Sequence, residues 1–281
     1  MQEQIVINGQ LISYQHFGSQ KSGQALIFLH GWRSQKEVWK QVASSMYHVS
    51  SIYCIDLPGF GASPSPKITP PSIPLALHGE GRGRGWSVGD YAQTVKGFIE
   101  KLELKNVILV GHSFGGRVGI KLCAAQNQQN NNSLLPSFIL REGTIQKLVL
   151  VDSAGFAMDT AKKSLMAGAA KIAKPFFKLK FMQGVRKKIY QTIGAEDYLA
   201  TPQLQKTFIN ITSEDLTEDM RCINIPTLII TGENDKDTPV AFGQRMNSLI
   251  PNSKFVILPN AGHYSFLDKP EEFVEALKEF I

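Results

Sequence analysis

The residues best suited to chemistry are a serine, an aspartate and a histidine that lie far apart in the chain. Ser113 lies in the glycine-rich segment 111–116 (GHSFGG), whereas Asp235 and His263 come much later. A serine hydroxyl is a poor nucleophile near neutral pH, so it needs a base that takes its proton and a third group that orients the base. Together the three side chains would support nucleophilic attack by Ser113.

The surroundings of Ser113 match this chemistry. An apolar run, 106–110 (NVILV), precedes the segment 111–116, and a helix-compatible run, 117–125 (RVGIKLCAA), follows it. The pattern G-x-S-x-G between a strand and a helix is typical of a nucleophile elbow, a sharp turn whose glycines remove Cβ atoms that would clash. The turn would lift the hydroxyl clear of the sheet, and the next helix would aim backbone N–H groups at developing negative charge.

The other two side chains also follow predicted strands. Asp235 comes after the apolar run 225–231, and His263 comes after 254–258. Because the carboxyl ends of parallel strands meet at one edge of an open α/β sheet, we expect the three side chains to converge there. Two more aspartates compete for the role of the acid: Asp152, which follows another predicted strand, and Asp237.

Strand and helix patterns alternate along most of the chain. The alternation predicts an α/β fold with a mostly parallel, doubly wound sheet, opened by a hairpin with a tight Asn8-Gly9 turn. We expect strands at 5–7, 10–17, 25–29, 49–55, 106–110, 144–151, 225–231 and 254–258, and helices at 36–47, 87–102, 117–125, 239–249 and 270–280.

The region 155–222 interrupts this alternation, because it has helical patterns and no clear strand. We therefore predict a core domain formed by residues 1–154 and 223–281, with a helical cap, 155–222, inserted between two core strands. Between positions 160 and 190 the cap has nine Lys/Arg and no acidic residue. A solvated cationic face above an apolar underside that lines a pocket is the simplest interpretation, although such a surface would also suit an anionic substrate or a membrane. The Pro- and Gly-rich stretch 64–86 is predicted to be a long surface loop.

Composition limits the class of protein. The chain has 281 residues, three widely spaced cysteines and a net charge of +6. It has no apolar run of the roughly 18 residues typical of a membrane helix and no signal-peptide pattern at its N-terminus. We expect a cytoplasmic protein with reduced cysteines and a small-molecule substrate, without a nucleic-acid partner or a membrane span. The oligomeric state is left open.

The motifs resemble those of the serine α/β-hydrolase family, including its capped esterases and carbon–carbon bond hydrolases. In this family the nucleophile, acid and base follow one another as Ser, Asp or Glu, then His, which is the order found here. The resemblance covers nearly the whole chain apart from 64–86 and the Gln/Asn tract 126–133. The matching segments are 30–32 (HGW), 56–63 (DLPGFGAS), 111–116 (GHSFGG), 232–235 (GEND) with Pro239, and 262–263 (GH).

The resemblance implies a role for each matching residue. Ser113 would be the nucleophile, His263 the general base and then acid, and Asp235 the orienting carboxylate. The backbone N–H groups of Trp32 and Phe114 would form the oxyanion hole.

Three further residues are predicted to border the substrate. These are His30, Gly31 and His112, with His30 bracing the oxyanion loop and His112 structural or lining the pocket. Neither histidine has a second ligand at metal-binding spacing, so we expect no metal and no other cofactor.

The expected activity is hydrolysis of a carboxylic ester or related acyl compound through an acyl-enzyme on Ser113. One alternative is carbon–carbon bond hydrolysis of a vinylogous diketone acid, whose carboxylate would need a cationic residue in the pocket. Another is a non-catalytic ligand receptor on the same fold. Dehalogenase and epoxide hydrolase chemistry is disfavoured, because those relatives have an aspartate in place of Ser113.

Overall fold

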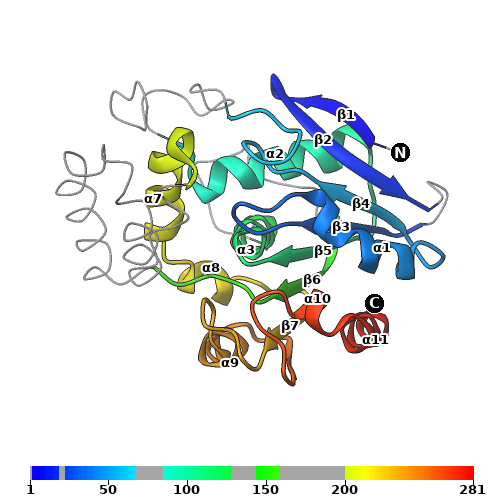
Figure 1. Cartoon of the computed structure of the whole chain (residues 1–281), viewed down its shortest axis with the longest axis vertical. Helices are drawn as coiled ribbons and strands as arrows, with labels where there is room; N and C mark the ends of the chain where they lie inside the picture. The colour runs from blue at the N-terminus through cyan, green and yellow to red at the C-terminus, as the bar shows by residue number, and fades with distance from the viewer. Residues whose placement is uncertain (1, 19–22, 67–84, 128–143, 158–199) are drawn as a thin grey trace, which may run out of the picture.

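The protein is built around one mixed sheet. The structure, a computed structural model, describes residues 2–18, 23–66, 85–127, 144–157 and 200–281. Within them an eight-stranded sheet has the order β1-β2-β4-β3-β5-β6-β7-β8 (Figure 1). The strands are β1 (Gln2–Ile7), β2 (Gln10–Phe17), β3 (Ala25–Leu29), β4 (Ser51–Ile55), β5 (Val107–His112), β6 (Ile145–Val151), β7 (Thr227–Gly232) and β8 (Ser253–Leu258).

The sheet is antiparallel at one edge only. Strands β1 and β2 form a hairpin, β2 pairs antiparallel with β4, and the remaining pairs are parallel. Asn8 and Gly9 at the hairpin turn both have positive φ, 50° and 77°, as a tight Asn-Gly turn requires. The prediction of an α/β fold with a mostly parallel sheet is confirmed.

Helices cover both faces of the sheet, so the central strands are buried throughout. In β3, Ile27 and Leu29 belong to the apolar cluster beneath α2 and α3, whereas Leu26 and Phe28 belong to the one beneath α1 and α11. The helical elements are η1 (Lys36–Trp39), α1 (Lys40–Met46), α2 (Val88–Lys101), α3 (Phe114–Asn127), η6 (Pro202–Leu204), α7 (Gln205–Ser213), α8 (Thr217–Arg221), α9 (Val240–Leu249), α10 (Ser265–Asp268) and α11 (Pro270–Phe280).

Some boundaries differ from those predicted. The helix expected over 36–47 is divided into the 3-10 turn η1 and the α-helix α1. The strand expected from Val49 begins at Ser51, because Val49 is 56% exposed and lies outside the sheet. Helix α10 was not predicted. No helix in the described segments is long and apolar enough to cross a bilayer.

Most of the expected cap, residues 158–199, lies outside the described residues, as do 67–84 and 128–143. The described end of the cap region contains η6, α7 and α8. The basic stretch of the cap, the centre of the 64–86 loop and most of the Gln/Asn tract therefore stay as predictions from sequence.

Candidate active site

Ser113 occupies the turn between β5 and α3. Its φ of 50° lies in the left-handed region, which is strained for a residue with a side chain. The turn also depends on close backbone packing: a Cβ on Gly111 would lie 2.5 Å from the carbonyl oxygen of Gly115, and one on Gly115 would lie 2.5 Å from that of Leu29. These two glycines of the elbow are thus required by the space that the turn leaves, because a Cβ at either position would clash with backbone.

The three side chains expected to act together are within hydrogen-bonding distance. The Nε2 atom of His263 lies 3.1 Å from the Ser113 hydroxyl oxygen, and its Nδ1 atom lies 2.9 Å from Oδ2 of Asp235. Ser113 follows β5, Asp235 follows β7 and His263 follows β8, so the carboxyl ends of three parallel strands supply them at the same sheet edge, with β6 between β5 and β7. A base at this distance from a serine and oriented by a carboxylate has the geometry for activating that serine.

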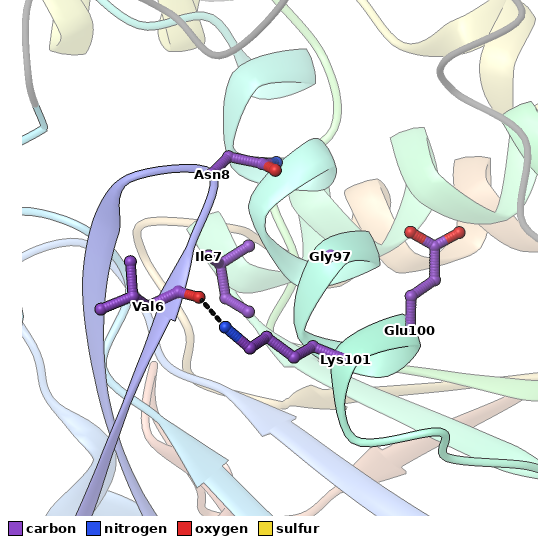
Figure 2. Close-up of a pocket in the computed structure, with 6 residues that line it drawn as sticks. All are labelled: Val6, Ile7, Asn8, Gly97, Glu100 and Lys101. Carbon is purple, nitrogen blue, oxygen red and sulfur yellow. Dashed lines mark hydrogen bonds between the residues drawn. The ribbon is translucent and has the colours of Figure 1, made fainter.

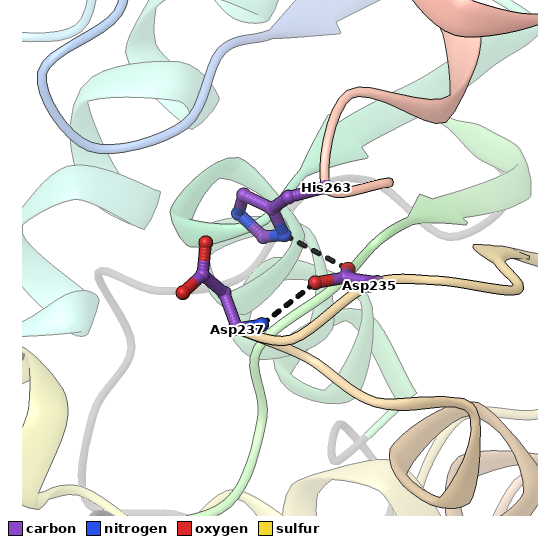
Figure 3. A group of neighbouring side chains, drawn as sticks. All are labelled: Asp235, Asp237 and His263. Carbon is purple, nitrogen blue, oxygen red and sulfur yellow. Dashed lines mark hydrogen bonds and ion pairs between the residues drawn. The ribbon is translucent and has the colours of Figure 1, made fainter. Parts of the chain in front are cut away.

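Asp235 is held by four hydrogen bonds, and Figure 3 draws the two that come from His263 and from the backbone N–H of Asp237. Its Oδ1 accepts the backbone N–H groups of Asp237 and Thr238, at 2.8 and 3.0 Å. Its Oδ2 accepts from His263 and from the Thr238 hydroxyl, the latter at 2.6 Å. The side chain of Asp235 is fully buried. Burial raises its pKa, but the hydrogen bonds from His263 and Thr238 outweigh burial and lower the pKa below the ordinary value.

The pKa of His263, the partner of Asp235, is shifted in the opposite direction. Burial lowers the pKa of His263, but the hydrogen bond and negative charge of Asp235, helped by Asp237 and Asp152, raise it above 6.5. An ionised Asp235 beside a more basic His263 is the charge arrangement that stabilises an imidazolium during proton transfer.

Asp235, Asp237 and His263 together also have the composition of a metal site, with one ligand atom of each lying within 4.8 Å of the others. The oxygens of Asp235, however, already accept four hydrogen bonds, and a cation would have to displace donors from them. Asp237 is exposed and contacts Asp235 through its backbone. The donor set therefore fits an oriented acid–base pair better than a cation.

Asp152, the rival acid, has different partners. Its carboxylate accepts the backbone N–H of Gly232 at 2.8 Å and that of Ser265 at 2.9 Å, so both oxygens are engaged away from the His263 ring. Burial raises its pKa to about 6, although both backbone donors favour the charged form. The Asp152 carboxylate thus connects the last residue of β7 to the start of α10, close to His263 in the chain.

His112 and His30 are both fully buried. The carbonyl oxygen of His263 accepts a hydrogen bond from Nε2 of His112 at 2.7 Å, so that nitrogen has the proton. Burial, and then the charge of His263, lower the pKa of His112 to about 3, and the ring is neutral. In His30 the tautomer is reversed: Nε2 accepts the backbone N–H of Leu57 at 3.0 Å, and Nδ1–H donates to the Gly31 carbonyl at 2.7 Å. A role for His30, Gly31 or His112 in substrate binding stays a prediction.

Gly31 lies where the loop after β3 approaches the elbow at His112 and Ser113. A Cβ there would be 2.7 Å from Nδ1 of His112 and 3.3 Å from Cβ of Ser113, so the loop after β3 can approach the elbow this closely only with glycine. In the described chain, the backbone N–H groups of Trp32 and Phe114 have no hydrogen-bond acceptor. Both amides are thus available to a ligand, and Phe114 is the first residue of α3, where the helix dipole favours negative charge.

A buried ion pair that sequence reasoning missed supports the loop after β3, which includes Gly31 and Trp32. The Nζ atom of Lys36 lies 2.6 Å from Oδ2 of Asp56, and the Lys36 backbone N–H donates to Oδ1 at 2.7 Å. The N–H of Ala62 donates to the same carboxylate at 2.9 Å. The side chains of Lys36 and Asp56 are 2% and 0% exposed, so the ion pair is shielded from water. It connects the loop after β3 to the loop after β4.

An aromatic contact links the core to the end of the cap region. The Trp32 ring lies 4.8 Å from that of Phe60, 5.4 Å from that of Phe114 and 5.3 Å from that of Phe208 on α7. Trp32 thus also contributes an apolar ring that contacts the described end of the cap region, and the Phe114 ring packs against Trp32.

Arg117 connects two segments of the predicted cap region, one at its start and one nearer its end. From the first turns of α3, its guanidinium donates to the carbonyl of Phe156 at 3.1 Å and to that of Glu214. Burial lowers its pKa to about 10, partly offset by the charges of Glu214 and Asp215. Its hydrogen bonds make Arg117 a structural residue, because a substrate would have to displace two carbonyls from the guanidinium.

A pocket elsewhere on the molecule lacks these features. It lies between β1 and α2 (Figure 2), where Lys101 donates to the carbonyl of Val6 at 2.8 Å. It is lined by Val6, Ile7, Asn8, Gly97, Glu100 and Lys101, and this lining has no serine or cysteine that could act as a nucleophile. It is at the far edge of the sheet from β7 and β8, so we assign it no chemistry.

Comparison with known proteins identifies relatives across the whole chain. A sequence profile of the alpha/beta hydrolase family matches residues 26–276. An AB hydrolase superfamily protein of Bacillus subtilis, YisY, is 25% identical, with 92% of this chain and 91% of that protein covered. A pimeloyl-[acyl-carrier protein] methyl ester esterase of Nitrosomonas europaea is 24% identical, with 92% and 96% covered. Among solved structures, an esterase from Exiguobacterium antarcticum has the same fold, with a TM-score of 0.69, 22% identity, and 100% and 99% of the two chains covered.

Proposed function

The chain belongs to the alpha/beta hydrolase family, and on that premise we propose that it hydrolyses a carboxylic ester or related acyl compound through an acyl-enzyme on Ser113. The observation that carries the proposal is the hydrogen-bonded series Ser113–His263–Asp235, with distances of 3.1 and 2.9 Å. The esterase-named relatives support an ester in preference to other acyl compounds.

In the first half of the proposed reaction, Oγ of Ser113 attacks the acyl carbon while Nε2 of His263 takes the hydroxyl proton. Asp235 stabilises the imidazolium that forms. The N–H groups of Trp32 and Phe114 stabilise the negative oxygen of the tetrahedral intermediate, each donor contributing roughly 3 kcal/mol. Collapse of the intermediate breaks the bond to the leaving alkoxide, which takes the proton from His263.

In the second half, His263 removes a proton from water as the water oxygen attacks the acyl-enzyme. The bond from the acyl carbon to Oγ of Ser113 then breaks, and the serine recovers its proton from His263. The products are a carboxylic acid and an alcohol, and no cofactor takes part in the proposed steps.

The test is turnover of p-nitrophenyl esters of graded chain length, combined with fluorophosphonate labelling and mass spectrometry of the modified peptide. We expect turnover, a label on Ser113, and loss of both in Ser113→Ala. Ser153→Ala is a matched control, because Ser153 lies beside the elbow and donates to the Ala154 carbonyl without contacting His263. Absence of ester turnover together with absence of labelling would overturn the proposal.

The same panel separates the alternatives. Cleavage of a vinylogous diketone acid without turnover of simple esters would indicate a carbon–carbon bond hydrolase. The carboxylate of such a substrate would need a cationic partner. Arg117 is not available for this, because its guanidinium already donates to two carbonyls, so another Lys or Arg would have to supply the charge. Tight ligand binding without turnover would indicate a receptor.

A further inference from the structure

Thr238 lies where the acid, the base and a third loop meet. It follows Asp235 in the loop between β7 and α9 and is 5% exposed. Its hydroxyl oxygen lies 2.6 Å from Oδ2 of Asp235, 3.3 Å from Nδ1 of His263 and 2.9 Å from the carbonyl oxygen of Asp152.

Counting protons determines the direction of these contacts. A threonine hydroxyl has one proton, whereas a carboxylate and a carbonyl can only accept. The proton goes to Asp235, because that contact is the shorter one and its acceptor is charged. Nδ1–H of His263 donates to the same Oδ2 at 2.9 Å, so its 3.3 Å contact with the hydroxyl oxygen is secondary. Oδ2 thus accepts from both the base and Thr238.

We propose that the Thr238 hydroxyl is a positioning group, which holds Asp235 in the orientation and ionised state in which Oδ2 faces the His263 ring. The proposal rests on the proposed role of Ser113, His263 and Asp235. Thr238 touches none of the reacting atoms and acts through Asp235. Its backbone N–H, which donates to Oδ1, fixes the other oxygen of the same carboxylate.

The nearby carbonyl of Asp152 gives the hydroxyl a second acceptor. Rotation about the Cβ–Oγ bond moves the proton from Asp235 to this carbonyl without moving any heavy atom. The hydroxyl is therefore satisfied whether Asp235 is charged or neutral. A serine has the same freedom, whereas alanine and valine have no proton to give.

The experiment compares Thr238→Ser with Thr238→Ala, which differ by one oxygen atom, and adds Thr238→Val, which keeps the shape of threonine. We expect the Ala and Val variants to lose about tenfold or more in kcat toward p-nitrophenyl esters, with little change in KM, because the lost hydrogen bond is to a charged group. The Ser variant should retain most of the activity.

The pH profile separates positioning from packing. With one donor fewer, the charge on Oδ2 binds the His263 proton more tightly, so the acid limb of kcat/KM should move to higher pH in the Ala and Val variants and stay in place in the Ser variant. The other groups that face His263 are Asp237, Asp152 and the neutral His112, and none of them is substituted. Asp152, whose pKa is about 6, therefore titrates in the wild type and in the variants, so the comparison between them isolates Thr238. Thermal unfolding of each variant shows whether it is folded.

Two results are decisive and distinct. If wild type is active and the Ser and Ala variants have the same kcat and acid limb, the inference is wrong and Thr238 only packs. If wild type neither turns over esters nor labels at Ser113, the proposed function itself fails.

Discussion

The ring of His112, the residue before Ser113, donates a hydrogen bond to the backbone carbonyl of His263, with 2.7 Å between Nε2 and the oxygen. The residue beside the candidate nucleophile thus holds the main chain of the candidate base. The two rings lie 4.9 Å apart, centroid to centroid. Movement of the His263 loop away from the elbow would leave a buried carbonyl and a buried N–H without partners, which is unfavourable.

Replacing His112 should therefore reduce turnover by displacing His263. We expect His112→Leu to lower kcat for every ester of a chain-length series alike, and to lower the free energy of unfolding by about 1–3 kcal/mol. His112→Gln retains an N–H donor and should be affected less. A variant that changes KM for long esters only would favour the substrate-binding role predicted from the sequence. Steady-state kinetics measure kcat and KM, and urea denaturation measures the free energy of unfolding.

The pH dependence of kcat/KM should have its acid limb above pH 6.5. His263 must be neutral to accept the serine proton, and its pKa is raised by Asp235. Activity should therefore be present above the pKa of His263 and fall as the pH decreases through it. His112, with its pKa near 3, is neutral throughout this range and should add no limb. A limb below 6.5 for p-nitrophenyl acetate would contradict this prediction.

Substitution of the two buried aspartates should separate their roles. Asp235→Asn presents the wrong tautomer to His263 and should lower kcat on the order of 10⁴-fold, as in other serine hydrolases. Asp152→Asn replaces one acceptor oxygen with an amide that opposes a backbone N–H, so we expect a loss of about 1–3 kcal/mol in stability and a much smaller loss in kcat. If Asp152→Asn has the larger effect on kcat, the assignment of the acid is wrong.

Arg117 should matter for stability more than its neighbour Lys121. Arg117→Met leaves the carbonyls of Phe156 and Glu214 without their donor, and each should cost about 1–3 kcal/mol if it stays buried. Lys121→Met removes ion pairs with Glu214 and Asp219 from a partly exposed site and should cost about 0–1 kcal/mol. If the two variants shift the midpoint of urea unfolding equally, Arg117 does not contribute more to stability than Lys121.

Sequence patterns correctly predicted the strands and helices whose signals lie within their own residues. The buried strand Ala25–Leu29 and the last helix, Pro270–Phe280, have the predicted boundaries, because an unbroken apolar run and a proline at a helix start are local signals. The helix predicted over 87–102 begins within one residue of its expected start, where Ser87 is the N-cap and forms a reciprocal pair with Asp90. Helix α10, only four residues long, has no periodicity that a sequence could reveal.

The site was predictable only in part, for a physical reason. Ser113, Asp235 and His263 could be named because each follows a strand within a motif. The tautomer of His112, by contrast, depends on a carbonyl 151 positions away, and the ion pair of Lys36 with Asp56 depends on two loops meeting. Thr238 had a usable signal, because an aspartate that accepts backbone N–H groups two and three residues on is a common turn.

The left-handed backbone of Ser113 has a consequence for how this protein would respond to selection. Its φ of 50° is one that glycine adopts freely, so Ser113→Gly should relieve strain of order 1 kcal/mol while removing the candidate nucleophile. A screen of random variants for heat resistance alone is expected to enrich that substitution, whereas a screen that also requires ester turnover is expected to reject it. At this position the demands of folding and of chemistry point in opposite directions.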